Sequence, residues 1–213
     1  MKQLHYFPGN ASMTPHMLLE ELGVPYELVL VDRTKNAHRD PAYLKLNPNG
    51  KIPVLVDGAL VLYETAAIVL HLVDTHPEAG FAPAVGTTER AEFYKWLMWL
   101  GNTLQAEMPL YFYSERWADT AEGAAQLKRH AEAHIAGMVD QLEAQFARHG
   151  GPWFLGRDYS ALDPYVLMLC RWTRGMARPA RTLAHLGPYL QRMLARPAVQ
   201  RAYAQEGLGE PRV

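Results

Sequence analysis

The chain of 213 residues lacks several features that would each point to a particular class of protein. It has a single cysteine, Cys170, so neither an intrachain disulfide nor a metal site made of several cysteines can form. No stretch approaches the roughly 18 uninterrupted apolar residues that a membrane-spanning helix needs. The N-terminus reaches Pro8-Gly9 too early for the hydrophobic region of a signal peptide. These absences favour a protein of a reducing, cytoplasmic compartment.

An excess of charge of one sign is also missing. The chain carries 21 basic and 22 acidic side chains, a formal net charge of -1, and no basic run of five or more residues. We therefore expect neither nucleic acid nor an anionic membrane as a partner. The hydrophobic share of 49% is that of an ordinary globular protein, and it predicts a sizeable buried core.

The first 80 residues alternate strand-like and helical patterns. Apolar runs and breakers predict strands at 4–7, 26–31, 52–56 and 60–63, helices at 14–22 and 65–76, and a loop with a short helix at 33–46. Ser12 or Thr14 is a candidate cap for the first helix, and the second strand is expected to be a buried run. The order βαβαββα predicts a mixed four-stranded sheet of the thioredoxin-like type.

Strand patterns disappear after a linker at 81–87. The remaining segments predict helices at 88–113, 120–149, 160–174, 188–195 and 197–205. We thus expect two domains, a thioredoxin-like domain at 1–80 and an all-helical domain at 88–213. The stretch from Phe93 to Leu100 leaves almost no polar face, which is typical of a central core helix and also of a helix that meets a partner subunit or an apolar ligand.

Three segments of the first domain could carry chemistry. At Pro8–Ser12 a strand joins a helix, where backbone N–H groups attract anions and Asn10 or Ser12 could hold a thiolate, although Ser12 could equally be a plain helix cap. At 47–53 the proline before a strand indicates a sheet edge that could pair with an extended peptide, and Lys51 could meet a carboxylate or only water. At Glu64-Thr65 another helix begins, with a carboxylate for an ammonium group and a hydroxyl that could also serve as a cap.

Together, the three segments suit one ligand. A short peptide with a thiol, a free α-amino-acid end and a distal carboxylate would use all of them, and glutathione has these three groups. Nothing in the sequence calls for a metal.

In these elements the sequence resembles the cytosolic glutathione transferases, most of all the bacterial ones. The resemblance rests on the strand–Pro8-Gly9–helix start, on Asn47-Pro48 through Ile52-Pro53, on Glu64-Thr65-Ala66-Ala67-Ile68, and on Ser160-Ala161-Leu162-Asp163. It implies a cis bond before Pro53, a homodimer and a detoxifying conjugation reaction. It also implies a capping box in which Ser160 and Asp163 satisfy each other's backbone N–H groups.

The chain departs from the family at the catalytic position. Ala11-Ser12 stands where the bacterial beta class has Cys-Ser, Asn10 stands where delta-like classes have their serine, and Gln105 aligns with a beta-class histidine. Mixed-disulfide chemistry through a cysteine at that position is therefore excluded. Ser12 is the first candidate for stabilising the thiolate and Asn10 the second, with the helix dipole assisting.

The resemblance implies conjugation of glutathione to an apolar electrophile. Ile52 would pair through its backbone, Pro53 would set the turn, Glu64 and Thr65 would hold the γ-glutamyl end, and Lys51 would hold the glycyl carboxylate. The candidates for the electrophile pocket are Trp99, Asn102, Tyr111, Tyr113 and Trp117. Isomerase, dehalogenase or disulfide-reductase activity on the same fold, and a non-catalytic binding module, are the alternatives.

Overall fold

The computed structural model describes all 213 residues, and they form two compact units. The first unit contains residues 1–82 and 192–212, and the second contains residues 83–191 together with Val213. Residues 192–212, which by sequence follow the other predicted helices of the second domain, cluster with the first unit. The unit boundary falls inside the helix α8, Leu186–Leu194.

The first unit is built on a mixed sheet with the strand order β2-β1-β3-β4. Its elements are β1 (Lys2–Tyr6), α1 (Met13–Leu22), β2 (Tyr26–Leu30), two 3-10 turns (Arg33–Lys35 and Ala37–Arg39), α2 (Pro41–Leu44), β3 (Val54–Asp57), β4 (Leu60–Tyr63), α3 (Thr65–Thr75), a 3-10 turn (Pro77–Ala79) and α9 (Pro197–Gln205). β1 runs parallel to β2 and antiparallel to β3, and β3 runs antiparallel to β4. The predicted thioredoxin-like arrangement is confirmed.

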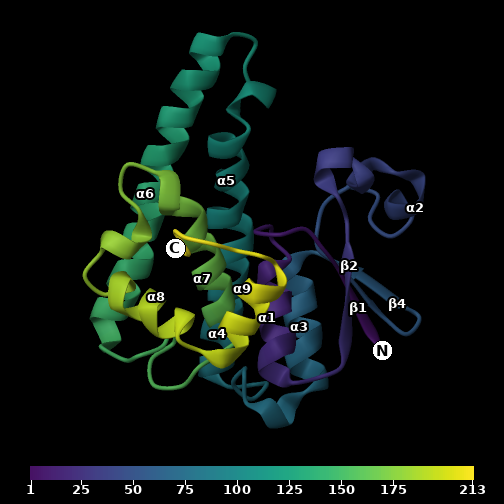
Figure 1. The fold of residues 1–213 in the computed structure, drawn as a ribbon. Helices are drawn as coiled ribbons and strands as arrows, with labels where there is room; N and C mark the ends of the chain where they lie inside the picture. The colour runs from purple at the N-terminus through teal and green to yellow at the C-terminus, as the bar shows by residue number, and fades with distance from the viewer. The chain divides into compact units, whose positions relative to one another are not determined.

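The sheet is covered differently on its two faces. α1 and α3 lie side by side on one face (Figure 1), over the fully buried Leu4 and Leu55. On the other face Val54 packs with Ile52 and with Tyr43 of α2. Since successive strand residues point to opposite faces, Val54 and Leu55 are each buried on a different side.

Two expectations about strand burial are wrong. β2 is an edge strand, so Leu30 is 54% exposed instead of buried. Pro53 precedes β3, which lies between β1 and β4 and is therefore an interior strand, not an edge. The Ile52–Pro53 bond is cis, as the family resemblance implied.

The start of α1 also differs from the expected cap. Ser12 precedes the helix, but its hydroxyl accepts no hydrogen bond from a helix N–H. It interacts with the backbone of Phe7 instead, at 3.3 Å from both the nitrogen and the oxygen. The hydroxyl thus closes the loop in front of the helix.

The second unit is helical. Its elements are α4 (Thr88–Trp99), a π-helical turn (Leu100–Leu104), α5 (Gln105–Phe112), a 3-10 turn (Ser114–Arg116), α6 (Ala121–His149), α7 (Leu162–Trp172), two 3-10 turns (Thr173–Gly175 and Ala180–Thr182) and the larger part of α8. The predicted helix at 88–113 is present as α4 and α5, joined without a break by the π-helical turn. There the N–H of Gln105 donates to the carbonyl of Leu100, five residues back.

The aromatic stretch of α4 is only partly covered within the chain. Phe93, Leu97 and Leu100 are fully buried, whereas Tyr94 is 38% and Met98 40% exposed. One face of α4 is therefore core, and an adjacent face presents apolar side chains to its surroundings.

The start of α7 contains the predicted pairing of Ser160 and Asp163, in altered form. Asp163 Oδ2 accepts from the Ser160 N–H at 2.8 Å, as expected. The Ser160 hydroxyl accepts from Leu162 N at 3.3 Å, not from Asp163 N, which donates to the Ser160 carbonyl at 3.0 Å. The expectation of a reciprocal box is thus correct on the Asp163 side only.

Asp163 is fully buried and also ties distant parts of the unit together. Its Oδ1 accepts from Phe154 N at 2.9 Å and from the Tyr189 hydroxyl at 3.1 Å. Burial raises the pKa of Asp163 to about 6, although these donors and Ser160 favour the ionised form. The carboxyl is a single acceptor for three chain segments.

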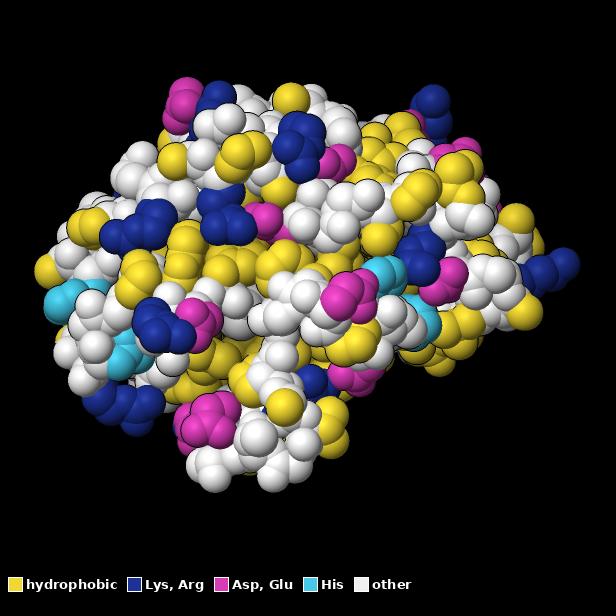
Figure 2. Space-filling model, turned by 90° about the horizontal axis from the view of Figure 1, so that it is seen from below, with side chains coloured by type: hydrophobic (Ala, Val, Ile, Leu, Met, Phe, Trp, Pro, Cys, Tyr) yellow, Lys and Arg dark blue, Asp and Glu magenta, His cyan; other side chains and the backbone are white.

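The structure contains no helix suited to span a membrane, because none combines the length and apolar character needed to cross a bilayer. On the face shown in Figure 2, Lys and Arg side chains are interspersed with Asp and Glu side chains, and neither sign gathers into a patch.

We predict that Asp163→Ala lowers the stability of the protein strongly. The change leaves the N–H groups of Phe154 and Ser160 without their acceptor, at about 1–3 kcal/mol for each orphaned group. At this chain length each kcal/mol lowers Tm by about 2–4 °C, which calorimetry can measure.

The stability difference between wild type and Asp163→Ala should depend on pH. The pKa of Asp163 is higher in the folded than in the unfolded state, so the folded state binds the extra proton between about pH 4 and 6. Wild-type stability relative to Asp163→Ala should therefore fall as pH rises through this window and level off above it. A difference that grows with pH would contradict the burial argument.

Candidate functional site

The sheet register brings the three segments that could carry chemistry to the same end of the sheet. Val54, the first residue of β3, pairs with His5 near the end of β1 and with Tyr63 at the end of β4. The loop after β1, the Ile52–Pro53 bond before β3 and the Glu64 junction after β4 therefore leave the sheet at the same end. Segments far apart in sequence are thus neighbours by register alone.

The loop after β1 is a tight turn stabilised by its own hydrogen bonds. Asn10 N donates to Phe7 O at 3.1 Å, and Met13 N donates to Asn10 O at 3.0 Å. Gly9 has φ +71°, a left-handed conformation that side chains disfavour, and this explains the glycine. The loop leads directly into α1, whose first N–H groups carry the positive end of the helix dipole.

The two candidates for thiolate stabilisation differ in accessibility. Ser12 is fully buried, and its hydroxyl is occupied by the Phe7 backbone. Asn10 is half-buried, and its Oδ1 accepts from Ala11 N at 2.8 Å. This bond orients the amide so that its NH₂ group is available to a ligand.

The segment around the cis bond is held from inside the first unit. The Lys51 carbonyl accepts from the Tyr43 hydroxyl at 2.7 Å and from Asn47 Nδ2 at 2.8 Å. Burial raises the pKa of Tyr43, which keeps this donor protonated. Ile52 and Pro53 are buried, and the Lys51 side chain is exposed. The backbone of the segment is thus fixed while its charge stays accessible.

The junction between β4 and α3 contains an unusual backbone conformation. Glu64 has φ 73° and ψ 117°, although it carries a side chain, and its carbonyl accepts from Ile68 N at 3.0 Å. Such a conformation costs about 1–3 kcal/mol and is concentrated at functional sites. The Glu64 side chain is exposed and Thr65 is buried. This strain could not be predicted from the residues, because the only signal was a strand followed by a helix without a turn residue between them.

One carboxylate near this loop was not predicted. Glu206, which follows α9 directly, is buried and accepts from Gly9 N through Oε2 at 2.8 Å. Its Oε1 lies 2.7 Å from Nδ1 of the buried His16 on α1. No local pattern could reveal this contact, because it joins residues 197 positions apart.

The five candidates for the electrophile pocket all lie in the second unit. Trp99 packs edge-on against Trp96 with ring centroids 5.3 Å apart, and Asn102 is exposed on the π-helical turn. Tyr111 and Tyr113 lie near the far end of α5, about 18 Å along the helix from Trp99 at the usual rise per residue. Trp117 is 64% exposed beyond that helix. Trp99 and Asn102 thus lie at one level of the long helix, Tyr111 and Tyr113 at its far end, and Trp117 beyond it.

Tyr111 is the most constrained of the five. Lys128 Nζ lies over its ring, 4.8 Å from the ring centroid, and its hydroxyl is 3.5 Å from the Gly175 carbonyl oxygen. Burial and the nearby Glu132 raise its pKa. Gln105, which aligns with the beta-class histidine, accepts a hydrogen bond from the hydroxyl of Tyr165. The amide of Gln105 is thereby oriented with its NH₂ group away from Tyr165.

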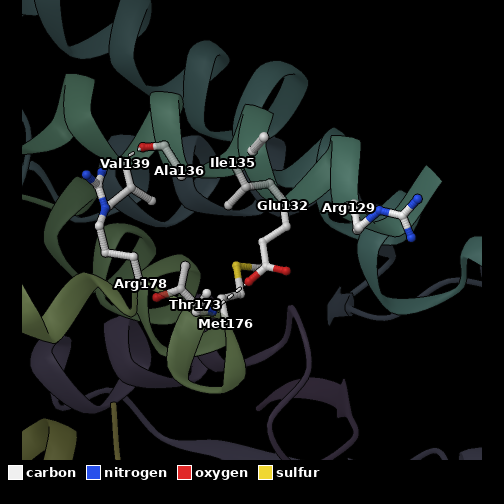
Figure 3. A pocket seen from close by; sticks show the side chains of 10 residues that line it. Arg129, Glu132, Ile135, Ala136, Val139, Thr173, Met176 and Arg178 are labelled. Carbon is white, nitrogen blue, oxygen red and sulfur yellow. Dashed lines mark hydrogen bonds between the residues drawn. The ribbon is translucent and has the colours of Figure 1, made fainter. Parts of the chain in front are cut away.

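A cavity of about 280 Å³ lies elsewhere in the second unit, between α6 and the segment after α7 (Figure 3). It is lined by Arg129, Glu132, Ala133, Ile135, Ala136, Val139, Thr173, Met176, Ala177 and Arg178. Glu132 accepts from Ala177 N at 2.6 Å across it. None of the five candidates lines this cavity. No group of three or more His, Cys, Asp or Glu side chains in the structure is arranged to hold a metal ion.

Comparison with known proteins identifies the family. Residues 1–74 match the family model "Glutathione S-transferase, N-terminal domain". Glutathione S-transferase 3 of Zea mays is 32% identical over 202 residues, which is 91% of this chain and 89% of the maize protein. Glutathione S-transferase GST-4.5 of Xanthomonas campestris is 29% identical over 97% of this chain and 99% of its own length.

A solved structure agrees. A Sulfitobacter glutathione transferase homolog, crystallised with bound glutathione, superposes with a TM-score of 0.88 at 27% identity and covers 96% of this chain and 98% of its own. The likeness extends over both the sheet-containing and the helical parts. The chain belongs to the glutathione S-transferase family.

Proposed function

We propose that the protein conjugates glutathione, as its thiolate, to an apolar electrophile. The observation that supports this most is the convergence of Asn10, Ile52 and Glu64 at one end of the sheet, in a member of a family whose relatives bind glutathione. In this proposal Glu64 and Thr65 bind the γ-glutamyl end, the Ile52 backbone pairs with the peptide next to Pro53, and Lys51 meets the glycyl carboxylate. The electrophile would approach from Trp99, Asn102, Tyr111, Tyr113 and Trp117.

The thiolate requires stabilisation that the loop after β1 can supply. A free thiol has a pKa of about 8.5, and lowering it by roughly two units takes about 2.7 kcal/mol. A helix N-terminus contributes about 0.3–1 kcal/mol, up to about 2, and a hydrogen bond to a charged group about 1.5–3 kcal/mol. We assign this hydrogen bond to the NH₂ group of Asn10, and we assign to the buried Ser12 the shaping of the loop.

The absence of cysteine from the loop excludes a mixed disulfide between this loop and glutathione. Ala11 stands where a mixed disulfide with glutathione would have to form, and the one cysteine, Cys170, is buried in α7. Retention on glutathione-agarose and turnover of chlorodinitrobenzene together test the proposal. Retention without turnover of this or any other electrophile would point to a non-catalytic binding module.

We expect Asn10→Ala to raise the pKa of bound glutathione by about one unit or more, because the thiolate loses one hydrogen bond worth about 1.5–3 kcal/mol. Thiolate absorbance measured against pH gives this value directly. Ser12→Ala is the matched control in the same loop, and its main effect should be on Tm. If Ser12→Ala changes the pKa of bound glutathione and Asn10→Ala does not, the two residues have the opposite roles.

A second substitution tests the placement of the γ-glutamyl end. Glu64→Ala should weaken glutathione binding by roughly 1–3 kcal/mol, since the ammonium group of the ligand loses its partner. Calorimetry measures the affinity. The control is Glu27→Ala, an exposed carboxylate opposite Gln3 at the other end of the sheet. A loss below twofold at Glu64, or an equal loss at Glu27, would rule out this placement.

We further propose that the protein is a homodimer, as the resemblance implied. Tyr94 and Met98 leave apolar surface on α4 uncovered within one chain, and a second copy would bury it. Light scattering at low micromolar concentration should give about twice the chain mass of 24.0 kDa. A mass near that of one chain would refute the dimer. A cytoplasmic location completes the proposal.

A further inference from the structure

The C-terminal segment after α9 reaches the loop that the proposed function assigns to the thiol. α9 lies beside α1 (Figure 1), and Glu206 follows it at once. One Glu206 oxygen accepts from Gly9 N at 2.8 Å and the other lies 2.7 Å from His16 Nδ1. Leu208 lies beside Gly9, because a side chain at position 9 would meet its Cδ2 at 3.7 Å. The segment therefore touches the loop from the protein interior.

The partners of His16 indicate how the network is protonated. Gln205 Nε2 donates to Glu20 Oε1 at 2.9 Å, so the amide oxygen of Gln205 is the atom that faces His16 Nε2 at 2.7 Å. His16 Nε2 must therefore carry a hydrogen. Nδ1 faces Oε1 of Glu206, and at 2.7 Å a hydrogen lies between these two atoms.

This arrangement places a hydrogen-bond partner at each oxygen of Glu206, His16 Nδ1 at one and the Gly9 N–H at the other. Both side chains are almost inaccessible, at 0% for His16 and 1% for Glu206. A hydrogen bond to a charged acceptor is stronger than one between neutral groups. The orientation of the Gly9 N–H is therefore held firmly, and Gly9 is the residue directly before Asn10.

We propose that Glu206 is a positioning residue of the thiol site. By fixing Gly9, it sets the direction in which the NH₂ group of Asn10 and the start of α1 face the sulfur. This inference rests on the proposed function for its chemistry, but the positioning of the loop by Glu206 is a property of the protein without ligand. The two can therefore be tested separately.

The experiment compares Glu206→Ala with a matched control, Glu21→Ala. Glu21 lies on α1, as His16 does, and it pairs with the C-terminal segment through Arg196 Nε at 2.5 Å. It has no contact with the loop after β1. Both substitutions weaken the packing of the same segment. Only Glu206→Ala should accelerate hydrogen exchange of the amides from Gly9 to Ser12 in the free protein.

The same two variants are then compared with glutathione bound, by the ionisation of its thiol and by its affinity. With glutathione itself as probe, Glu206→Ala should reduce the acid dissociation constant of the bound thiol by about tenfold, as expected for weakening one hydrogen bond to a charged group. Affinity for glutathione should change less, because Glu64 and Lys51 are untouched. Glu21→Ala should leave thiol ionisation unchanged.

Glu206→Gln should restore the positioning of the loop that Glu206→Ala loses. Its amide oxygen can accept from Gly9 N while its NH₂ group donates to a neutral His16, so loop exchange and thiol ionisation should return close to wild type. If Glu206→Ala does not fold, Glu206→Asp, whose side chain is one methylene shorter, takes its place. It should also exchange loop amides faster than Glu21→Ala and ionise the bound thiol less readily.

The proposal is overturned if the loop exchanges equally in the Glu206 and Glu21 variants, or if Glu206→Gln behaves like Glu206→Ala. A wild-type protein that fails to bind or ionise glutathione would refute the proposed function instead. In that case the exchange data alone decide whether Glu206 positions the loop.

Discussion

The antiparallel pairing at Val54 is the constraint on which the candidate site depends. This one residue is opposite His5 on β1 and opposite Tyr63 on β4, so the three strand ends are placed side by side. A shift of one residue would turn Val54 and Leu55 to the wrong faces, and both are fully buried. The core packing that fixes the register therefore also fixes the distances among Asn10, Ile52 and Glu64.

The loop after β1 shows how a site can be built mostly from backbone. Ser12 uses its hydroxyl on Phe7 and Asn10 uses its oxygen on Ala11, so both side chains first stabilise the turn. What remains for a ligand is the NH₂ group of Asn10 and the positive end of the α1 dipole. A donor and a helix dipole that face the sulfur favour a thiolate over a thiol. The absence of a cysteine in the loop then leaves glutathione as the source of the sulfur in the proposed reaction.

Local patterns predicted the order of elements well, because apolar periodicity and breakers such as Pro8-Gly9 are local signals. They failed where the answer depends on neighbours in space. The exposure of Leu30 depends on β2 lying at the sheet edge, and the interior position of β3 depends on which strands flank it. The turn of the Ser12 hydroxyl toward Phe7 and the positive φ of Glu64 are likewise set by the loop and the register. The cis bond before Pro53 came from the family resemblance and not from the residues themselves.

The contact between Glu206 and Gly9 also bears on how the site forms during folding. The sheet, α1 and α3 are complete within the first 75 residues, yet the acceptor for the Gly9 N–H arrives from residue 206. Closing such a long loop is entropically costly, and it is rewarded only when the partner surface already exists. The sheet and its helices would thus form first and α9 would dock on α1 afterwards, bringing Glu206 to His16. On this view the end of the chain completes the loop at its beginning, which is why residues 192–212 cluster with the first unit despite following the helical one in sequence.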